Sequence, residues 1–381
     1  MLLYKLLTGS LLCISLQSAA QELKKPSPRN TIRNFINPDS LPLMNLKVIP
    51  VPILTSSPET GIRAGGALEY FFNAKEKGKS SEARGSYVHG QLTFSSLGQL
   101  ELKGSWQIFT KGERYVFKGS AGYTTSMDRF WGIGNNTLAE DNYYKQDYSR
   151  LYLESKTYRL LKNNWYAGLA IDYNDIYNVK TNKALDPVNL KVPGINGSKF
   201  LGLGPAFLYE GRDFPFSAHK GAYAECFFTH YLPVGGDQFR FDTWMMDLRK
   251  FYPLNANTTV AFQFLSQNSI GNTPLRAIPK IGGPLMMRGY FTGRYRDQSY
   301  TAAQAEIRYH IWRWIYGASF IAGGILDKSL SKYELNNLHY AGGTGLRFLV
   351  NKKNRMFLRV DYALNSSSSG NAYYIRLNEA F

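Results

Sequence analysis

Hydrophobic and polar residues alternate along many segments of this chain. In residues 303–311, Ile307 and Tyr309 occupy one set of alternate positions, and Glu306 and Arg308 occupy the other. Successive side chains of a β-strand point to opposite faces of the sheet. The alternation therefore predicts strands that each have one apolar face and one polar face.

The number and length of these segments favour a transmembrane barrel. Most run for about 9 to 14 residues, whereas strands of globular proteins favour about 5 or 6 and tilted membrane strands need about 9–11. We predict about sixteen strands, an even number as in bacterial single-chain barrels. Their expected spans are residues 46–54, 60–72, 83–95, 98–110, 113–125, 147–161, 163–176, 199–210, 220–231, 238–251, 257–268, 299–311, 314–326, 338–350, 355–364 and 372–381.

The predicted links between strands alternate in length. Short links fall at residues 111–112, 162, 312–313 and 351–354, and long links fall at residues 126–146, 177–198, 269–298 and 327–337. Bacterial barrels have short periplasmic turns and longer extracellular loops. Both termini are then expected in the periplasm. Residues 73–82 and 211–219 depart from the pattern, because they are long for periplasmic links.

Composition agrees with such a barrel. Hydrophobic residues make up 44% of the chain and charged residues 19%, and the 27 tyrosines suit the aromatic girdles at membrane interfaces. The formal charge of +17 is scattered, without the Lys/Arg-rich run typical of a nucleic-acid patch. We therefore expect no nucleic-acid partner. A cationic lumen, or cationic rims that face anionic lipid headgroups, accounts for the charge.

The N-terminus has the features of a secretory signal peptide. Lys5 precedes an apolar stretch at residues 6–16, and Ser18, Ala19 and Ala20 form a small-residue cleavage site. The apolar stretch is shorter than the roughly 20 residues of a membrane-spanning helix. We expect three parts: a signal peptide at residues 1–20, a proline-bearing periplasmic arm at residues 21–45, and an outer-membrane β-barrel at residues 46–381.

Three segments carry motifs. Residues 202–221 contain Arg212-Asp213 and, further on, Gly221; residues 281–296 contain Arg288-Gly289-Tyr290; residues 373–381 begin at Tyr373 and end in the aromatic Phe381. Together these segments resemble the BamA/TamA-type outer-membrane barrel superfamily, also called the bacterial surface antigen family. In the last strand we expect Tyr373 and Phe381 to face outward as an assembly signal, with Glu379 interrupting that face.

The resemblance implies an all-β, transmembrane antiparallel barrel of about 16 strands in the cell outer membrane. It also implies that the long loop with the Arg-Gly-Tyr motif folds into the lumen. Family members usually carry periplasmic POTRA domains before the barrel, and residues 21–45 are too few for one. We therefore expect a member that lacks POTRA domains. A separate periplasmic partner could take their place.

The resemblance gives Arg288 the role of a loop latch. In this family the second strand after the loop often carries an Asp that pairs with the loop arginine, but Ala322 stands at that place here. Glu306 and Asp361, on lumen-facing positions, are the candidate partners, since a guanidinium binds carboxylates strongly. The alternative is a solvated arginine in an ordinary loop. For Arg212 and Asp213 we favour an ion pair in a periplasmic turn, which contributes little to stability.

Three functions are consistent with the sequence. The first is a gated scaffold that aids insertion or translocation of proteins, or lipids, through a weak seam between the first and last strands; Pro50 and Pro52 each remove a hydrogen-bond donor there. Its partners would be outer-membrane lipids and unfolded outer-membrane protein clients. The second is a passive pore or structural barrel. The third, a hydrolase, is disfavoured because none of the five histidines lies in a catalytic or metal-binding motif, so we expect no enzyme activity, cofactor or metal.

Overall fold

The computed structural model describes residues 48–72, 74, 84–185, 189–352, 355–367 and 371–381. The expected signal peptide (residues 1–20) and periplasmic arm (residues 21–45) lie outside the described residues, and the account below concerns the barrel alone. In the described part of the chain, no helix is both long enough and apolar enough to cross a membrane.

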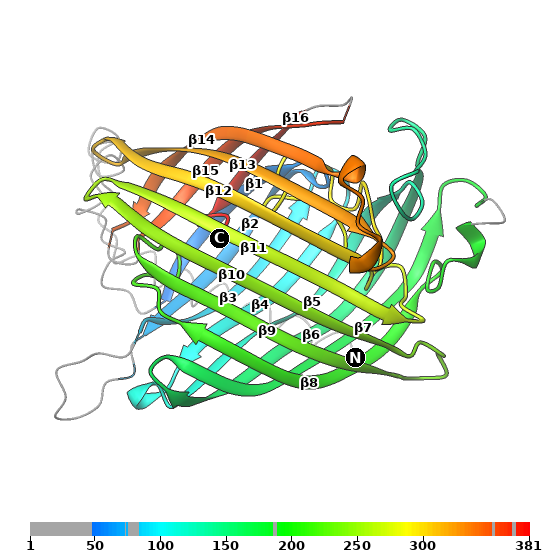
Figure 1. Cartoon of the computed structure of the whole chain (residues 1–381), viewed down its shortest axis with the longest axis horizontal. Coiled ribbons are helices and arrows are strands. Elements are labelled where there is room, and N and C mark those ends of the chain that lie inside the picture. Colours follow the sequence, from blue (N-terminus) through cyan, green and yellow to red (C-terminus); the bar gives the residue numbers. More distant parts are fainter. Residues whose placement is uncertain (1–47, 73, 75–83, 186–188, 353–354, 368–370) are drawn as a thin grey trace, which may run out of the picture. The chain divides into compact units, whose positions relative to one another are not determined.

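Sixteen antiparallel strands form one closed barrel (Figure 1). Each strand pairs with its neighbours in sequence, and the first strand pairs with the last, which confirms the predicted fold class. The strands are β1 (Val48–Ser57), β2 (Gly61–Phe72), β3 (Ser86–Ser95), β4 (Leu100–Phe109), β5 (Tyr115–Phe130), β6 (Tyr144–Lys162), β7 (Trp165–Thr181), β8 (Ser198–Glu210), β9 (Gly221–Pro233), β10 (Phe241–Asn255), β11 (Thr258–Gly271), β12 (Ser299–Trp312), β13 (Ile315–Asp327), β14 (His339–Asn351), β15 (Met356–Asn365) and β16 (Asn371–Leu377).

The wall of the barrel has an apolar outside and a polar inside. On β12, Ile307 and Tyr309 are exposed, while Glu306 and Arg308 are buried. Most strands carry large exposed apolar side chains on their outward positions, such as Ile321 on β13. Contiguous exposed apolar surface larger than a few hundred Å² marks a protein or membrane interface. A band that runs around the barrel suits lipid, as the alternation predicts.

Long and short links separate the two ends of the barrel. The β5–β6, β7–β8, β11–β12 and β13–β14 links lie at one end, here called the loop end. The β4–β5, β6–β7, β10–β11 and β12–β13 links lie at the other, here called the turn end, and are at most five residues long. The β8–β9 link, residues 211–220, is the described long link at the turn end.

Some strand bounds differ from the prediction. β5, β6 and β7 have 16, 19 and 17 residues and extend past the apolar band at the loop end. Pairs such as Asp128 with Gln146 and Phe130 with Tyr144 continue the ladder there, and their side chains contact residues of the long links, such as Arg296 and Leu275. Side chains at this end pack against the links and do not face lipid, so the period-two signal that the prediction used ends before the strand does.

Candidate functional site

Arg288 lies at the centre of a buried ion cluster. It belongs to the β11–β12 link, residues 272–298, here called the long loop, and only 1% of its surface is exposed. Its Nη2 donates to Glu306 Oε2 on β12 at 2.6 Å, and its Nη1 donates to Asp361 Oδ2 on β15 at 2.8 Å. The guanidinium carbon lies 3.4 Å from the centre of the Phe320 ring on β13. One loop residue thus contacts inward-facing side chains of three strands.

The two carboxylates that hold Arg288 have further arginine partners. Arg308 Nε donates to Glu306 Oε1 at 2.7 Å, and Arg347 Nη1 donates to Asp361 Oδ1 at 2.6 Å. Arg347 Nε also donates to Glu379 Oε2, beyond β16, at 2.8 Å. Buried charges are costly unless they are paired, and removing one partner of a buried pair costs about 3–5 kcal/mol. The cluster therefore fixes the position of the loop strongly.

The backbone of the Arg-Gly-Tyr motif contacts the last two strands. Gly289 N–H donates to Tyr374 Oη on β16 at 3.1 Å, and Asn365 Nδ2 on β15 donates to Gly289 O at 2.6 Å. The Tyr290 hydroxyl lies 2.7 Å from Ser366 Oγ in the β15–β16 link. Through these three contacts the motif is attached to the hairpin that ends the barrel.

The same loop also contacts the hairpin that begins the barrel. Thr292 donates to Glu59 Oε1 from its backbone N–H at 2.8 Å and from Oγ1 at 2.7 Å, and Glu59 lies in the β1–β2 link. Arg296 Nη2 reaches Asp128 on β5 at 2.6 Å, which fixes the far end of the loop. The long loop therefore bridges the β1–β2 and β15–β16 hairpins at the loop end.

The seam between β1 and β16 is short. Among the described residues it is formed by the single pair Ser56 and Ile375, whereas β15 and β16 pair from residue 358 with 377 to residue 364 with 371. In an antiparallel pair the two residue numbers have a constant sum, which here is 431 from Ser56 and Ile375. If β16 continued in this register, Pro52 would face residue 379 and Pro50 would face residue 381. Proline has no N–H to donate to a ladder.

The chain beyond β16 leaves the sheet and turns inward. Asn378 has a φ of 66°, and Phe381 is buried with its ring centre 6.2 Å from that of Phe251 on β10. Arg308 Nη2 donates to Phe381 O at 3.0 Å. The expectation that Phe381 ends an outward-facing strand is therefore wrong. Glu379 in the same stretch would have been costly against lipid, and it finds Arg347 inside instead.

Comparison with solved structures finds barrels of the same architecture. BamA from Haemophilus ducreyi, in a crystal structure lacking POTRA domains 1–3, matches with a TM-score of 0.54 and 10% identity over 87% of this chain and 70% of that one. CdiB from Acinetobacter baumannii matches at 0.53 with 12% identity, and CdiB from Escherichia coli at 0.56 with 10%. This chain has the barrel fold of BamA and CdiB.

The likeness to BamA and CdiB lies in the fold, and it confirms at that level the resemblance drawn from the motifs. Each CdiB match also covers 87% of this chain, which spans 60% and 63% of the two CdiB structures. No protein-family model and no curated protein sequence matches the chain.

At the turn end of this BamA-like barrel, the β8–β9 link holds the second motif. Arg212 Nη2 donates to Glu210 Oε2 at 2.6 Å, so the expected pair of Arg212 with Asp213 is not what forms. Asp213 Oδ1 instead accepts backbone N–H groups within the link, those of residues 214, 219 and 220. Gly221 has a φ of 109°, and a Cβ there would lie 2.1 Å from Gly211 O. The motif shapes the link.

This link reaches across the lumen. The Phe216 ring centre lies 5.8 Å from that of Phe71 on β2 and 5.1 Å from that of Tyr87 on β3. On the opposite wall, Ala218 packs in one buried cluster with Phe251 on β10 and Phe381. Since the link contacts both walls, it forms with residues 378–381 a partial cover at the turn end, here called the floor.

The structure brings together one set of the expected residues and separates the others. Arg288, Gly289, Tyr290, Glu306 and Asp361 converge in one buried region. In contrast, Pro50, Pro52 and Tyr373 lie on the outside of the seam strands, and Arg212, Asp213 and Gly221 belong to the turn end.

Several residues of this region were missed from the sequence. Arg347 and Tyr374 occupy inward positions of predicted strands, where alternation predicts an inward side chain but names no partner. Asp128 lies on β5, in a segment that the prediction assigned to a link. Glu59 lies in a link and has no such signal. Among the described residues, no three His, Cys, Asp or Glu side chains converge as a metal site would require.

Proposed function

We propose that this chain is a gated outer-membrane barrel that aids the insertion or translocation of polypeptides. The short seam carries the proposal: the pair of Ser56 and Ile375 stands alone among the described residues, while neighbouring strands elsewhere pair along most of their length. A closed barrel with one weak junction has one place where it opens. The motif resemblance and the BamA-like fold support the same role.

The proposal sets an orientation in the bilayer. The loop end is extracellular and the turn end is periplasmic, because barrels of this class have long extracellular loops and short periplasmic turns. The apolar band then faces outer-membrane lipid. The floor faces the periplasm, where a client polypeptide or a separate periplasmic partner would arrive.

The edge of β1 supplies the mechanism. Between Val48 and Leu54, no described residue of β16 pairs with β1. A strand edge with free N–H and C=O groups is a template for an incoming extended segment. A client strand that pairs with this edge would enter the bilayer with its backbone hydrogen-bonded, as a lipid environment requires. Pro50 and Pro52 reduce the donors of this strand and so limit its pairing within the barrel.

The long loop is the latch of this gate. Its contacts with Glu59 on one side and Tyr374 on the other bridge the two hairpins that flank the seam. Separation of the hairpins breaks at least one of these contacts. The Arg288 cluster holds the loop, and its energy opposes opening.

The proposal is tested by locking the seam. Ser56→Cys and Ile375→Cys, combined with Cys226→Ser, place two thiols at the paired outward positions of β1 and β16. The barrel is placed in proteoliposomes, and the assembly of an unfolded outer-membrane barrel client is followed by protease protection. We expect the oxidised protein to lose at least about nine-tenths of its activity and to regain it on reduction, because only the reduced seam can separate.

A matched lock controls for the disulfide itself. Ala303→Cys and Gly323→Cys pair β12 with β13, away from the seam, and the nearest atom to a Cβ at Gly323 is His339 O at 4.0 Å. This variant should assemble clients equally well when oxidised or reduced. Full activity of the oxidised seam lock would refute the gate.

A further inference from the structure

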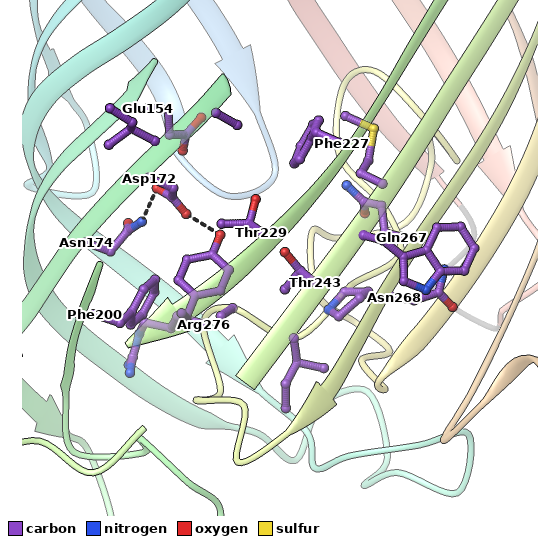
Figure 2. A pocket seen from close by; sticks show the side chains of 18 of the residues that line it. Glu154, Asp172, Asn174, Phe200, Phe227, Thr229, Thr243, Gln267, Asn268 and Arg276 are labelled. Carbon is purple, nitrogen blue, oxygen red and sulfur yellow. Dashed lines mark hydrogen bonds between the residues drawn. The ribbon is translucent and has the colours of Figure 1, made fainter. Parts of the chain in front are cut away.

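A separate cavity lies between the barrel wall and the long loop. Its volume is about 300 Å³, and it is lined by inward side chains of β6 to β11 and by loop residues 276–280 (Figure 2). None of the latch residues Arg288, Glu306 and Asp361 lines it. Its volume is at the small end of the range for ligand sites, which suits a small molecule.

The loop side of the cavity carries two cations without carboxylate partners. Arg276 donates to neutral acceptors, Gln146 Oε1 at 3.0 Å and the backbone oxygens of residues 194 and 195. The Lys280 ammonium makes no hydrogen bond or ion pair with any described residue. The carboxylate of Asp128 attracts Lys280 electrostatically, but Asp128 already accepts a hydrogen bond from Arg296 at 2.6 Å. Arg276 and Lys280 are half-buried, and half-buried cations without a paired anion favour an anionic ligand.

The opposite wall presents groups that bind hydroxyls. Asp172 accepts a hydrogen bond from Tyr231 Oη at 2.6 Å and one from Asn174 Nδ2 at 2.7 Å, and no described cation forms an ion pair with it. Figure 2 shows Asp172, Asn174 and Thr229 together on one side of the cavity, with Thr243 beside them. A carboxylate has about four lone-pair sites, so two accepted bonds leave capacity for ligand hydroxyls.

Aromatic rings complete the lining. Phe200 on β8 and Phe227 on β9 line the same cavity (Figure 2). Small-molecule sites combine apolar and aromatic walls with a few placed polar groups. Here the lining combines two cations of the loop, groups that bind hydroxyls and two aromatic rings.

We propose that this cavity binds a small phosphorylated sugar. The phosphate would lie against Lys280 and near Arg276, the hydroxyls would bond to Asp172, and the sugar ring would pack on Phe200. The strands separate the cavity from the bilayer, so the ligand is a free molecule of the lumen water and not a lipid headgroup. The inference does not depend on the gate.

The proposal predicts a dependence on pH. Burial, together with the nearby positive charge of Arg296, lowers the pKa of Lys280 to about 8, and Asp128 opposes this shift. The other charged groups at the cavity are Arg150, Glu154, Lys156, Asp172 and Arg276. A sugar phosphate is mostly a dianion from pH 7, since its second pKa is about 6. Lys280 is mainly protonated at pH 7 and mainly neutral at pH 9, so affinity should fall about fivefold or more between them.

The test is calorimetric titration of the full barrel in nanodiscs at pH 7 with glucose 6-phosphate, glucose and inorganic phosphate. We expect glucose 6-phosphate to bind at least tenfold more tightly than either of the others. Lys280→Met and Asp172→Asn should each weaken binding at least tenfold. Lys332→Met, at an exposed position in the β13–β14 link, should leave it unchanged. Lys280→Met should also abolish the fall in affinity from pH 7 to pH 9.

Other outcomes overturn the proposal. Undetectable binding of glucose 6-phosphate at 10 mM, or equal binding by the Lys280→Met variant, removes the site altogether. Phosphate binding as tightly as glucose 6-phosphate would show a plain anion site and remove the sugar. Circular dichroism and heat-modifiable gel mobility of each variant verify that the barrel has folded, so weak binding is not mistaken for misfolding.

Discussion

Replacing Arg288 should release the long loop without unfolding the barrel. Arg288→Gln removes the charge-assisted hydrogen bonds to Glu306 and Asp361, which contribute about 1.5–3 kcal/mol each. The contact with Phe320 adds about 2 kcal/mol for a desolvated cation. The carboxylates keep other arginine partners, and glutamine can replace one bond. We therefore expect a net loss of about 3 kcal/mol of docking energy, or about a hundredfold in the docking equilibrium.

Hydrogen exchange followed by mass spectrometry measures this loss directly. The Gly289 N–H is protected by Tyr374 Oη, so its exchange reports whether the motif is docked. Peptides that cover residues 285–292 should exchange about a hundredfold faster in Arg288→Gln than in the unaltered barrel. Peptides from β6 and β7 should be unchanged. Arg288→Lys should behave almost like Arg288→Gln, because a point charge cannot bridge the two carboxylates as a planar guanidinium does.

A matched variant separates loss of the latch from loss of any arginine. Arg313 is exposed in the β12–β13 link, at the turn end, and Arg313→Gln should leave exchange in the loop unaltered. An Arg288→Gln barrel whose loop exchanges less than about threefold faster would refute the reasoning, since three buried contacts would then hold almost nothing.

Three further substitutions test the same structure. Gly289→Ala should also undock the loop, because the φ of Gly289 is 111° and the added Cβ would lie 2.8 Å from Leu364 O. Gly66→Ala, where no atom lies within 4 Å of the added Cβ, should leave hydrogen exchange in the loop unchanged. Phe381→Ala should lower the free energy of unfolding in a urea titration by up to about 3–5 kcal/mol; no change would mean that the ring is not packed inside. Asp213→Ala should speed limited proteolysis within residues 211–220 several-fold, because three backbone N–H groups lose their acceptor, and an unaltered cleavage rate would argue against the floor.

The alternation was enough to predict the barrel, because the lipid requires an apolar side chain at every second position of a spanning strand. It located sixteen strands and the polar face that carries Glu306 and Asp361. The alternation failed to predict strand ends that lie beyond the lipid, where outward side chains need not be apolar. The loop-end parts of β5 to β7 pack on the long links through side chains such as Phe130 and Tyr144, so no outward apolar face marks the strand there.

The end of the chain was mispredicted for a different reason. Alternate positions 373, 375 and 377 read as one outward face, which suggested that Phe381 continues it. The turn at Asn378 reverses this, since Glu379 gains Arg347 inside the barrel. Arg347 belongs to another strand, and its distance from Glu379 depends on the curvature of the barrel and not on sequence spacing.

The candidate site shows the same limit. The Arg-Gly-Tyr motif and two inward carboxylates were recognisable, because a loop arginine needs an anion in the lumen. Contacts with Glu59 and Tyr374 were not, since both are set by how far residues 272–298 extend over the loop end. The proposed role of the loop across the seam rests on those contacts and could not have been derived from the motif.

The central claim is that the long loop holds the seam between β1 and β16 closed, and a distance measurement tests it most directly. Spin labels are attached at Leu54→Cys and Tyr373→Cys, both exposed on the outside of the seam strands, in a Cys226→Ser background. The distance between the labels is measured in nanodiscs by pulsed electron–electron double resonance. The account predicts one narrow, short distance when Arg288 is present and a second, longer population in Arg288→Gln. The same single distance in both proteins would contradict it.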